Sequence, residues 1–491
     1  MLGDSRAKVS CCSHTLAIGA CLRYRSVGFR IEAKEKPVAE IRMMATTGMV
    51  GYGYTEEAFR RGLDQGLDFI AADGGSMDPG PHYLGEGIPF VSRAAMKRDL
   101  SLMLEAAIEY HIPMLIGSAG GGGGEPQLAL MREIIEEIAT EKDLHFKMAV
   151  IHSEQPLDVL KKKRAAGLIE SLGPIKELTN DVIDETHRVV AMMGVEPFQK
   201  AIKCGAQVIL AGRATDASIY SAIPLMQGAD PGLSWHLSKI IECAGQVTTP
   251  RPGQDCVLGT LRDDHFLVEP GHPDKRCTRM RIAAHTLYEN PSPYHLEEPD
   301  GTLVTTDSEY EQLDERIVKV SGSRFEKSNR YTVKLEGVKS SGFRTVFMAG
   351  VRDPILISVI DEFIASCHER VTSEARNLDI SQDQYRLNIR VYGKDATMGP
   401  REPVKAPQPH EIGLLVDVLA DNPETSKAIM AKARYALLHT DFPGRKCISG
   451  NLAIPFSPSD MPVGQTYEFN IWHRMEIDDP LAPFPIEIVE V

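Results

Sequence analysis

The sequence predicts an α/β fold with a mostly parallel sheet and flanking helices, followed by a smaller α+β domain at the C-terminus. Short apolar runs alternate with longer segments in which apolar residues recur at helical spacing, which is the pattern of βαβ units. Polar or glycine-rich clusters follow directly after several of the apolar runs. Because parallel strands end at one edge of a sheet, we expect these clusters to share one ligand-binding rim.

Each element of the main domain has a local signal. Apolar runs that end in polar clusters predict strands at residues 39–47, 67–72, 146–151 and 208–212. Amphipathic patterns predict helices at residues 93–110, 128–138 and 196–204. Further along, residues 330–336 and 344–349 alternate like paired strands, 354–376 is an expected helix and 387–392 an expected strand. In the last part we expect helices near 413–420 and 425–438, and strands near 447–454 and 465–472.

Composition changes along the chain divide it into segments. We expect a tail at residues 1–37, the α/β domain at 38–380, a strand and connection at 381–398, a proline-rich linker at 399–410, and the α+β domain at 411–491. The tail holds seven Lys/Arg and three Asp/Glu in an otherwise acidic chain. We expect it to be disordered, although its basic character also fits an organelle transit peptide.

Charge and cysteine usage exclude several classes of protein. The 491-residue chain has a formal net charge of −14, which disfavours nucleic-acid binding. No apolar run reaches the roughly 18 residues that span a membrane. Its nine cysteines lack the C-x-x-C spacing of zinc sites and the framework of disulfide-rich secreted proteins. We therefore expect a cytoplasmic protein, with a mitochondrial location left open by the basic tail, and no metal and no cofactor.

A glycine-rich stretch at residues 114–126 is the most conspicuous motif. An apolar run leads into Ser118 and five consecutive glycines, and an amphipathic pattern follows Pro126; the five are Gly120, Gly121, Gly122, Gly123 and Gly124. Ordering five glycines is entropically costly, which is acceptable where backbone must approach a ligand oxygen at a helix N-terminus. The stretch therefore predicts an anion-binding loop, with a flexible hinge as the alternative.

Acidic and basic residues after the other strands are the candidates for chemistry. Asp73, Ser76 and Asp78 share one glycine-rich loop, where two carboxylates could divide into acid and base. The alternative is that Asp73 caps loop N–H groups and Asp78 belongs to a turn. His152 is a candidate general base, and Glu125 ends the glycine loop.

Arg213 is the candidate anion-binding group, because its guanidinium can hold a carboxylate or phosphate with forked donors. Thr215 and Asp216 follow it as substrate-binding candidates, and a buried ion pair between Arg213 and Asp216 is the alternative. His285 and Glu289 are spaced like two metal ligands on one helical face, but no third ligand is evident, so we interpret the pair as structural.

Several motifs together resemble the acyclic terpene utilisation (AtuA) family. The likeness extends from about residue 40 to about residue 375, and the C-terminal part looks like the companion domain often joined to this family. The motifs are the glycine run and residues 48–53 (GMVGYG), 72–85 (ADGGSMDPGPHYLG), 194–198 (GVEPF), 211–214 (AGRA) and 284–289 (AHTLYE). The resemblance implies catabolism of acyclic terpenes such as citronellol and geraniol, whose intermediates are branched acyl-CoA thioesters.

We therefore expect an enzyme that acts on a small carboxylate or branched acyl-CoA by cofactor-independent proton transfer, of lyase, hydratase or isomerase type. Asp73, Glu125 and His152 are the catalytic candidates, and the glycine-loop N–H groups would stabilise an enolate-like oxygen. The alternatives are a hydrolase, although the chain has no G-x-S-x-G elbow, and a non-catalytic acyl-CoA-binding or scaffold subunit. The expected partner is a small anionic molecule, with no nucleic acid or membrane, and we expect a homo-oligomer.

Overall fold

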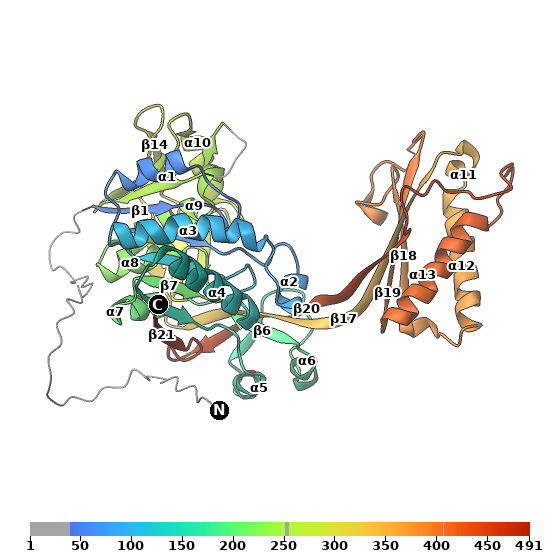
Figure 1. The fold of residues 1–491 in the computed structure, drawn as a ribbon, viewed down its shortest axis with the longest axis horizontal. Helices are drawn as coiled ribbons and strands as arrows, with labels where there is room; N and C mark the ends of the chain where they lie inside the picture. Colours follow the sequence, from blue (N-terminus) through green and yellow to red (C-terminus); the bar gives the residue numbers. More distant parts are fainter. Residues whose placement is uncertain (1–39, 251–254, 406) are drawn as a thin grey trace. The chain divides into compact units, whose positions relative to one another are not determined.

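The computed structural model describes residues 40–250, 255–405 and 407–491. Two compact units are present: unit 1 comprises the described residues up to Val338 together with Phe469–Val491, and unit 2 comprises Lys339–Glu468. The chain passes from unit 1 into unit 2 within β17 (Tyr331–Val351) and returns within β20 (Asp460–Ile477) (Figure 1). The expected tail at residues 1–37 lies outside the described residues.

Unit 1 is built on a ten-stranded sheet with the order β14-β15-β10-β9-β1-β2-β3-β7-β4-β21. Five neighbouring strands in its centre are parallel, and antiparallel strands lie on both sides of them. The parallel strands are β1 (Ile41–Ala45), β2 (Phe69–Asp73), β3 (Met114–Gly117), β7 (Val208–Ala211) and β4 (Lys147–Ile151). The antiparallel strands are β9 (Val257–Leu261), β10 (His265–Pro270), β15 (Val318–Ser321), β14 (Glu309–Gln312) and the C-terminal β21 (Ile486–Glu490).

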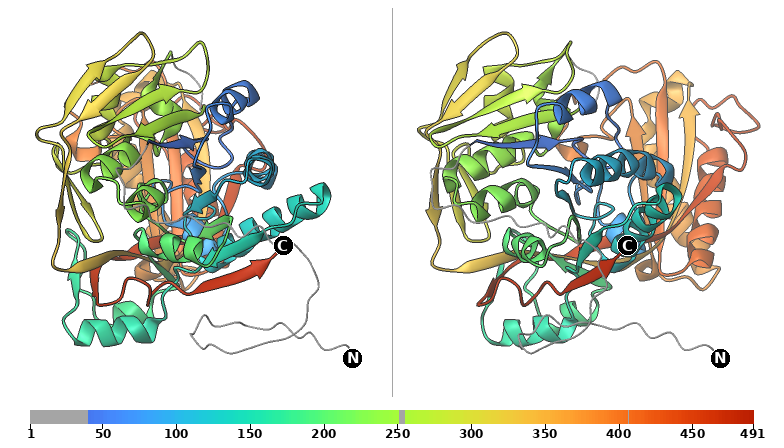
Figure 2. Two further views of the ribbon diagram at one scale, coloured as in Figure 1. Left: turned by 90° about the vertical axis from the view of Figure 1, so that its left-hand side faces the viewer. Right: turned by 60° about the vertical axis from the view of Figure 1, so that its left-hand side comes forward.

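Helices cover both faces of this sheet (Figures 1 and 2). On one face, α1 (Glu56–Leu63), α3 (Arg93–Glu109) and α4 (Glu125–Lys142) pack their apolar residues against alternate strand residues. On the other face, α7 (Glu196–Lys203), α8 (Ser218–Met226) and α9 (Pro231–Ile241) do the same. Strands buried on both faces read as continuous apolar runs, and this is why the sequence revealed them. The predicted α/β class is confirmed.

Smaller elements complete unit 1. They are α2 (His82–Glu86), α5 (Leu157–Ala165), β5 (Ile169–Ser171), α6 (Asn180–Asp184), β6 (Arg188–Ala191), the 3₁₀ turn η1 (Ala244–Val247), β8 (Thr248–Thr249), β11 (Arg276–Cys277), α10 (Arg279–Thr286), β12 (His295–Glu298), β13 (Gly301–Val304) and β16 (Arg324–Lys327). In the described part of the chain, no helix combines the length and apolar character needed to cross a membrane.

Unit 2 contains antiparallel strands backed by helices. β19 (Ile412–Ala420) pairs with both β18 (Tyr385–Tyr392) and the second half of β17. The helices α11 (Pro354–Ser358), α12 (Ile360–Arg376) and α13 (Pro423–His439) contribute to its apolar core. The remaining elements are the short 3₁₀ turns η2 (Gln382–Gln384) and η3 (Gly399–Arg401).

Three expectations for this region were wrong. The expected helix at 413–420 is strand β19, because alternate residues of this apolar run enter the core and a short apolar run does not distinguish helix from strand. Residues 330–336 and 344–349 belong to one long strand, so they do not pair with each other. No strand forms at 447–454. The proline-rich segment expected as a linker lies within unit 2, between β18 and β19, which pair with each other.

Candidate functional site

Unit 1 contains a cavity of about 870 Å³, a volume typical of small-molecule sites. Part of its wall comes from residues that follow β2 and β7, at the carboxyl ends of parallel strands. Eight carboxylates and four Lys/Arg side chains line it, so negative charge predominates when all are ionised. Its apolar lining consists of Met77, Leu172, Met192, Ala217, Pro291, Leu296, Pro299 and Trp472.

Arg213 lies at the base of the cavity and its charge is already compensated. Its side chain is 5% exposed, and Nε donates to Glu336 Oε2 at 2.8 Å. Nη1 donates to Ser118 Oγ at 2.9 Å and lies 3.7 Å from Asp216 Oδ1. Lys334 Nζ forms a second ion pair with Glu336 at 2.8 Å. These contacts agree with the interpretation of Arg213 as part of a buried ion-pair network.

Asp73 and Asp216 are two carboxyls beside Arg213. Burial raises the pKa of Asp73 well above its usual value, and nearby Asp216 raises it further, while Arg213 opposes both effects. The pKa of Asp216 is also raised by burial, against the influence of Arg213 and Lys239. Within the described residues, Asp73 Oδ1 has no hydrogen-bond partner. Asp216 lines the cavity and Asp73 does not.

Glu242 is the most deeply buried carboxyl of the cavity group besides Glu336, with 3% of the residue exposed. It follows the last turn of α9, and its Oε1 lies 2.5 Å from Lys239 Nζ. Burial raises the pKa of Glu242 to about 8 despite Lys239, and Asp216 adds to the shift. The pKa of Glu289 rises to about 7, first through burial and then through its hydrogen bond with Asp78.

Glu298 ends β12 and faces the same cavity. It is 9% exposed, and its Oε2 has no hydrogen-bond partner in the part of the chain that the structure describes. Burial raises its pKa to about 8, the nearby Thr215 side chain lowers it, and Glu242 raises it. A carboxyl with a pKa near neutral can both accept and release a proton at physiological pH.

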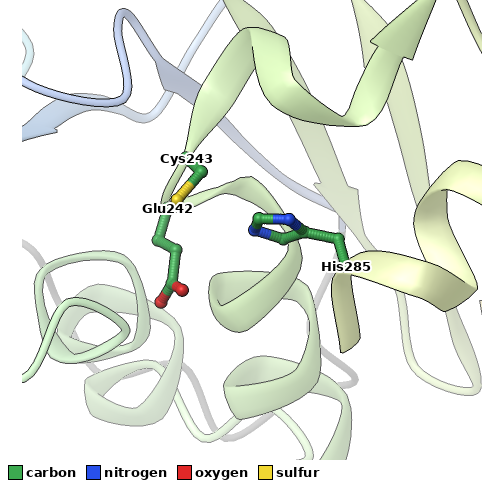
Figure 3. A group of neighbouring side chains, drawn as sticks. All are labelled: Glu242, Cys243 and His285. Carbon is green, nitrogen blue, oxygen red and sulfur yellow. The ribbon is translucent and has the colours of Figure 1, made fainter. Parts of the chain in front are cut away.

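Two groups of side chains have the spacing of metal ligands. Glu242, Cys243 and His285 each offer one donor atom, and these atoms all lie within 4.8 Å of one another (Figure 3). Asp216, Glu242 and Glu289 form a second such group that shares Glu242. The helix α10 ends at Thr286, so His285 and Glu289 do not lie on one helical face as the sequence suggested.

The glycine loop uses most of its N–H groups within the protein. Gly121 and Gly123 donate to the carbonyls of Ser118 and Ala119. Gly120 donates to Met131 Sδ, and Gly124 donates to Gln127 Oε1 at 3.0 Å. None of these glycines lines the cavity. The loop is glycine-rich because it is tightly packed: at Gly123 (φ +67°), a Cβ atom would lie 2.2 Å from Arg213 N.

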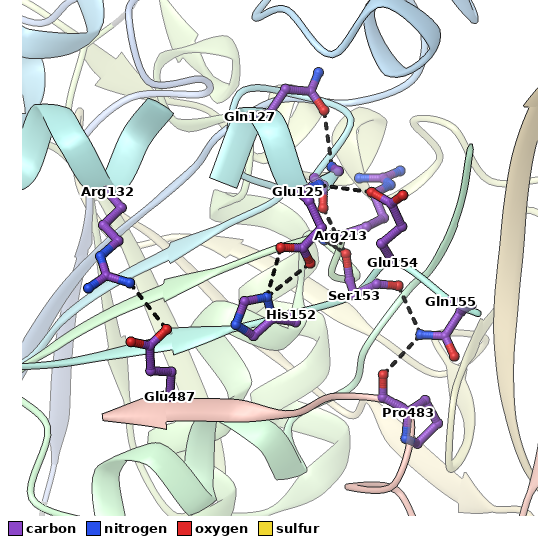
Figure 4. A network of polar contacts seen from close by, with 12 residues as sticks. Glu125, Gln127, Arg132, His152, Ser153, Glu154, Gln155, Arg213, Pro483 and Glu487 are labelled. Atoms are coloured by element: carbon purple, nitrogen blue, oxygen red, sulfur yellow. Dashed lines mark hydrogen bonds and ion pairs between the residues drawn. The ribbon is translucent and has the colours of Figure 1, made fainter. Parts of the chain in front are cut away.

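Glu125 and His152 form a pair (Figure 4), and neither residue lines the cavity. His152 Nδ1 lies 2.9 Å from the Glu125 carboxylate, and the side chains are 30% and 46% exposed. This hydrogen bond raises the pKa of His152, against partial burial. The neighbouring Ser153 connects this region to Arg213, because Ser153 Oγ accepts from the Arg213 backbone N–H at 2.7 Å.

The predicted residues therefore separate into three groups. Those that line the cavity are Ser76, Asp78, Arg213, Thr215 and Asp216. Asp73 and Ser118 lie behind it, next to Arg213. Glu125, His152 and the five glycines do not line the cavity. The sequence analysis missed Lys239, Glu242, Glu298 and Glu336. The one available signal was that Lys239 and Glu242 are three residues apart, the spacing of neighbouring side chains on a helix.

The sequence model of the acyclic terpene utilisation family protein AtuA matches residues 94–252 and 265–459. The chain belongs to the AtuA family. The match starts later than the resemblance noted in the sequence and continues through most of unit 2. Comparisons with curated proteins and with solved structures gave no match. Membership implies a role in acyclic terpene utilisation.

Proposed function

We propose that this AtuA-family protein is an enzyme of acyclic terpene catabolism that transfers a proton to or from an acyl substrate in the cavity. The main observation in support is that one cavity combines an apolar wall with Glu298, a buried carboxyl whose pKa is about 8. The apolar side chains would contact a branched hydrocarbon chain. Glu298 would exchange a proton with the carbon next to the substrate carbonyl, which is lyase, hydratase or isomerase chemistry.

The charge of the cavity favours an acyl thioester over a free acid. Eight carboxylates outnumber four Lys/Arg side chains, and Arg213 and Lys334 are already paired with Glu336. When these carboxylates are ionised, they would repel a free carboxylate, whereas the acyl group of a thioester is neutral at the reacting carbonyl. A branched acyl-CoA is consequently the better substrate class. In this proposal, Asp216, Asp73 and Arg213 together form the polar end of the cavity.

Solvent-deuterium exchange tests this function without knowledge of the product. We expect the protein to incorporate deuterium next to the carbonyl of at least one branched acyl-CoA from a panel. Glu298→Gln keeps the shape and removes the proton carrier, so exchange should fall about 10²–10⁴-fold, the usual contribution of general acid–base catalysis. Glu309→Gln, at an exposed position on β14, is the matched control and should exchange at the wild-type rate.

The outcomes separate the alternatives. Exchange that persists at the wild-type rate in Glu298→Gln would refute the role of Glu298. A large loss in Asp73→Asn with little change in Glu298→Gln would assign the proton transfer to Asp73. Tight binding of an acyl-CoA by calorimetry without any exchange would instead support a non-catalytic binding subunit.

A further inference from the structure

We propose that Glu242, Cys243 and His285 form a site for a divalent metal ion of the zinc class in the wall of the cavity. Their donor atoms are an oxygen, a sulfur and a nitrogen that lie within 4.8 Å of one another (Figure 3). Zinc accepts this combination of donors, with metal–ligand distances of about 2.0–2.3 Å in tetrahedral geometry. Small side-chain movements would therefore bring all three to one ion. The inference goes beyond the proposed proton transfer and does not depend on it.

The local fold explains why these residues meet. Glu242 and Cys243 directly follow α9, and the chain then turns into η1, where Ala244 has φ +42°. His285 belongs to the last turn of α10 and is buried. Its ring stacks on Tyr288 with a centroid distance of 5.1 Å and an interplanar angle of 16°, which restricts the orientation of the imidazole. The ends of α9 and α10 thus bring the three donor atoms close together.

The cavity side of this group leaves room for further ligands. Glu242 lines the cavity, whereas Cys243 and His285 lie behind it. Asp216 and Glu289 also line the cavity and form a second group with Glu242, again within 4.8 Å. Three protein ligands with one position open to a cavity are typical of catalytic zinc sites, where substrate or water occupies the fourth position. An ion here would face whatever molecule the cavity binds.

Lys239 would compete with a metal ion for Glu242, but the contacts of Lys239 leave part of the Glu242 carboxylate free for the ion. Its Nζ contacts only Oε1 of Glu242 among the described carboxylates, and a carboxylate has two oxygens. The same Nζ lies 5.6 Å from the centre of the Tyr288 ring, which offers a second stabilising contact. The eight carboxylates of the lining exceed the four Lys/Arg side chains, so a divalent cation reduces the electrostatic repulsion.

Cobalt binding to the full-length protein tests the site directly. Co²⁺ replaces zinc in such sites, and a cysteine ligand produces a thiolate-to-cobalt charge-transfer band in the near ultraviolet. We expect this band in the wild type, its disappearance on addition of Zn²⁺, and its absence in Cys243→Ser. Cys277→Ser is the matched control, because Cys277 is buried outside the group and should leave the band unchanged.

Zn²⁺ competition provides a second measurement that is independent of the thiol variant. Loss of an outer-sphere partner lowers metal affinity about 10–100-fold, so loss of a ligand in His285→Gln or Glu242→Gln should weaken Zn²⁺ binding at least as much. His295→Gln, at an exposed position of the cavity lining, is the control and should bind Zn²⁺ like the wild type.

Three results would overturn the site: no thiolate band in folded wild type, an unchanged band in Cys243→Ser, or equal Zn²⁺ affinity in His285→Gln and wild type. If Cys243→Ser does not fold, the comparison of His285→Gln with His295→Gln still decides the question. Deuterium exchange plays no part in these measurements. Failure of the proposed proton transfer with intact metal binding is therefore distinguishable from failure of the metal site.

Discussion

Unit 1 contains two acid-rich groups that differ in their environment. The Glu125–His152 pair is partly exposed, with side-chain exposures of 46% and 30%, and each residue is the hydrogen-bond partner of the other. In the group around Asp216 and Glu242, Glu242 is 3% exposed and the Asp216 side chain is 24% exposed. The carboxylates that line the cavity outnumber its Lys/Arg side chains. Glu125, His152 and Asp216 follow strands of the same sheet, whereas Glu242 follows α9. Similar residue types therefore give an ordinary surface pair in one place and an unbalanced charge cluster in the other.

The difference shows which feature makes an acidic residue a functional candidate. Water screens the exposed pair and satisfies its remaining polar atoms, so it needs no ligand. In the buried group, the excess negative charge must be relieved by a proton, a metal ion or a substrate. The raised pKa values of Glu242 and Glu298 result first from burial and then from the neighbouring carboxylates.

Removing the buried cation should have the largest effect on stability. Arg213→Met leaves Glu336, which is fully buried, without one of its two cationic partners and removes the counter-charge of Asp216. Breaking a buried ion pair in this way costs about 3–5 kcal/mol. Both tryptophans, Trp235 and Trp472, belong to unit 1, so tryptophan fluorescence during urea denaturation follows this unit. Arg93→Met, at an exposed pair with Glu133, is the control and should change stability by less than about 1 kcal/mol.

The glycine loop connects the two groups. Gly123→Ala should have the next largest effect on stability. The substitution places an L residue at φ +67° and a Cβ atom against the Arg213 backbone. Backbone strain of this kind costs about 1–3 kcal/mol, and the close contact adds to it. Gly121→Ala has similar backbone strain (φ +97°), but its Cβ would lie 3.5 Å from the nearest heavy atom. Equal melting temperatures for the two variants would show that the contact with Arg213 is unimportant.

Glu298→Gln should change the pH dependence of stability. The folded-state pKa of Glu298 is about 8, above its usual value of 4.5, so the folded state retains the proton more strongly than the unfolded state. The wild type therefore loses stability as pH rises from about 4.5 to about 8, and the glutamine variant avoids this loss. Denaturation midpoints of the two proteins should diverge towards high pH. A constant difference across this window would contradict the raised pKa.

The exposed pair should give the smallest effect. His152 has a pKa above 6.5 because of its hydrogen bond to Glu125, so the pair stabilises the fold fully below pH 6.5 and loses this contribution as pH rises through the folded-state pKa. Its partial exposure limits the contribution to less than about 1 kcal/mol. Glu125→Gln should therefore lower the melting temperature slightly at low pH and leave it unchanged at high pH. A loss as large as that of Arg213→Met would remove the contrast between the two groups.

The sequence by itself determined the alternation of strands and helices in unit 1 and five of the residues that line the cavity. Both depend on local patterns: buried parallel strands appear as apolar runs, and Arg213, Thr215 and Asp216 come directly after one of them. The same local reasoning failed for β19, because an apolar run of nine residues does not establish a helical or a strand period.

Only the tertiary structure decided which acidic residues form the site. Glu242, Glu298 and Glu336 come from α9, β12 and β17, which are distant in sequence and meet at one cavity. Whether a carboxylate is a solvated surface group or a buried proton carrier depends on its desolvation and on charges from other segments. These quantities are set by packing between elements, so neither the excess charge of the cavity nor the proximity of Glu242, Cys243 and His285 could be inferred from spacing along the chain.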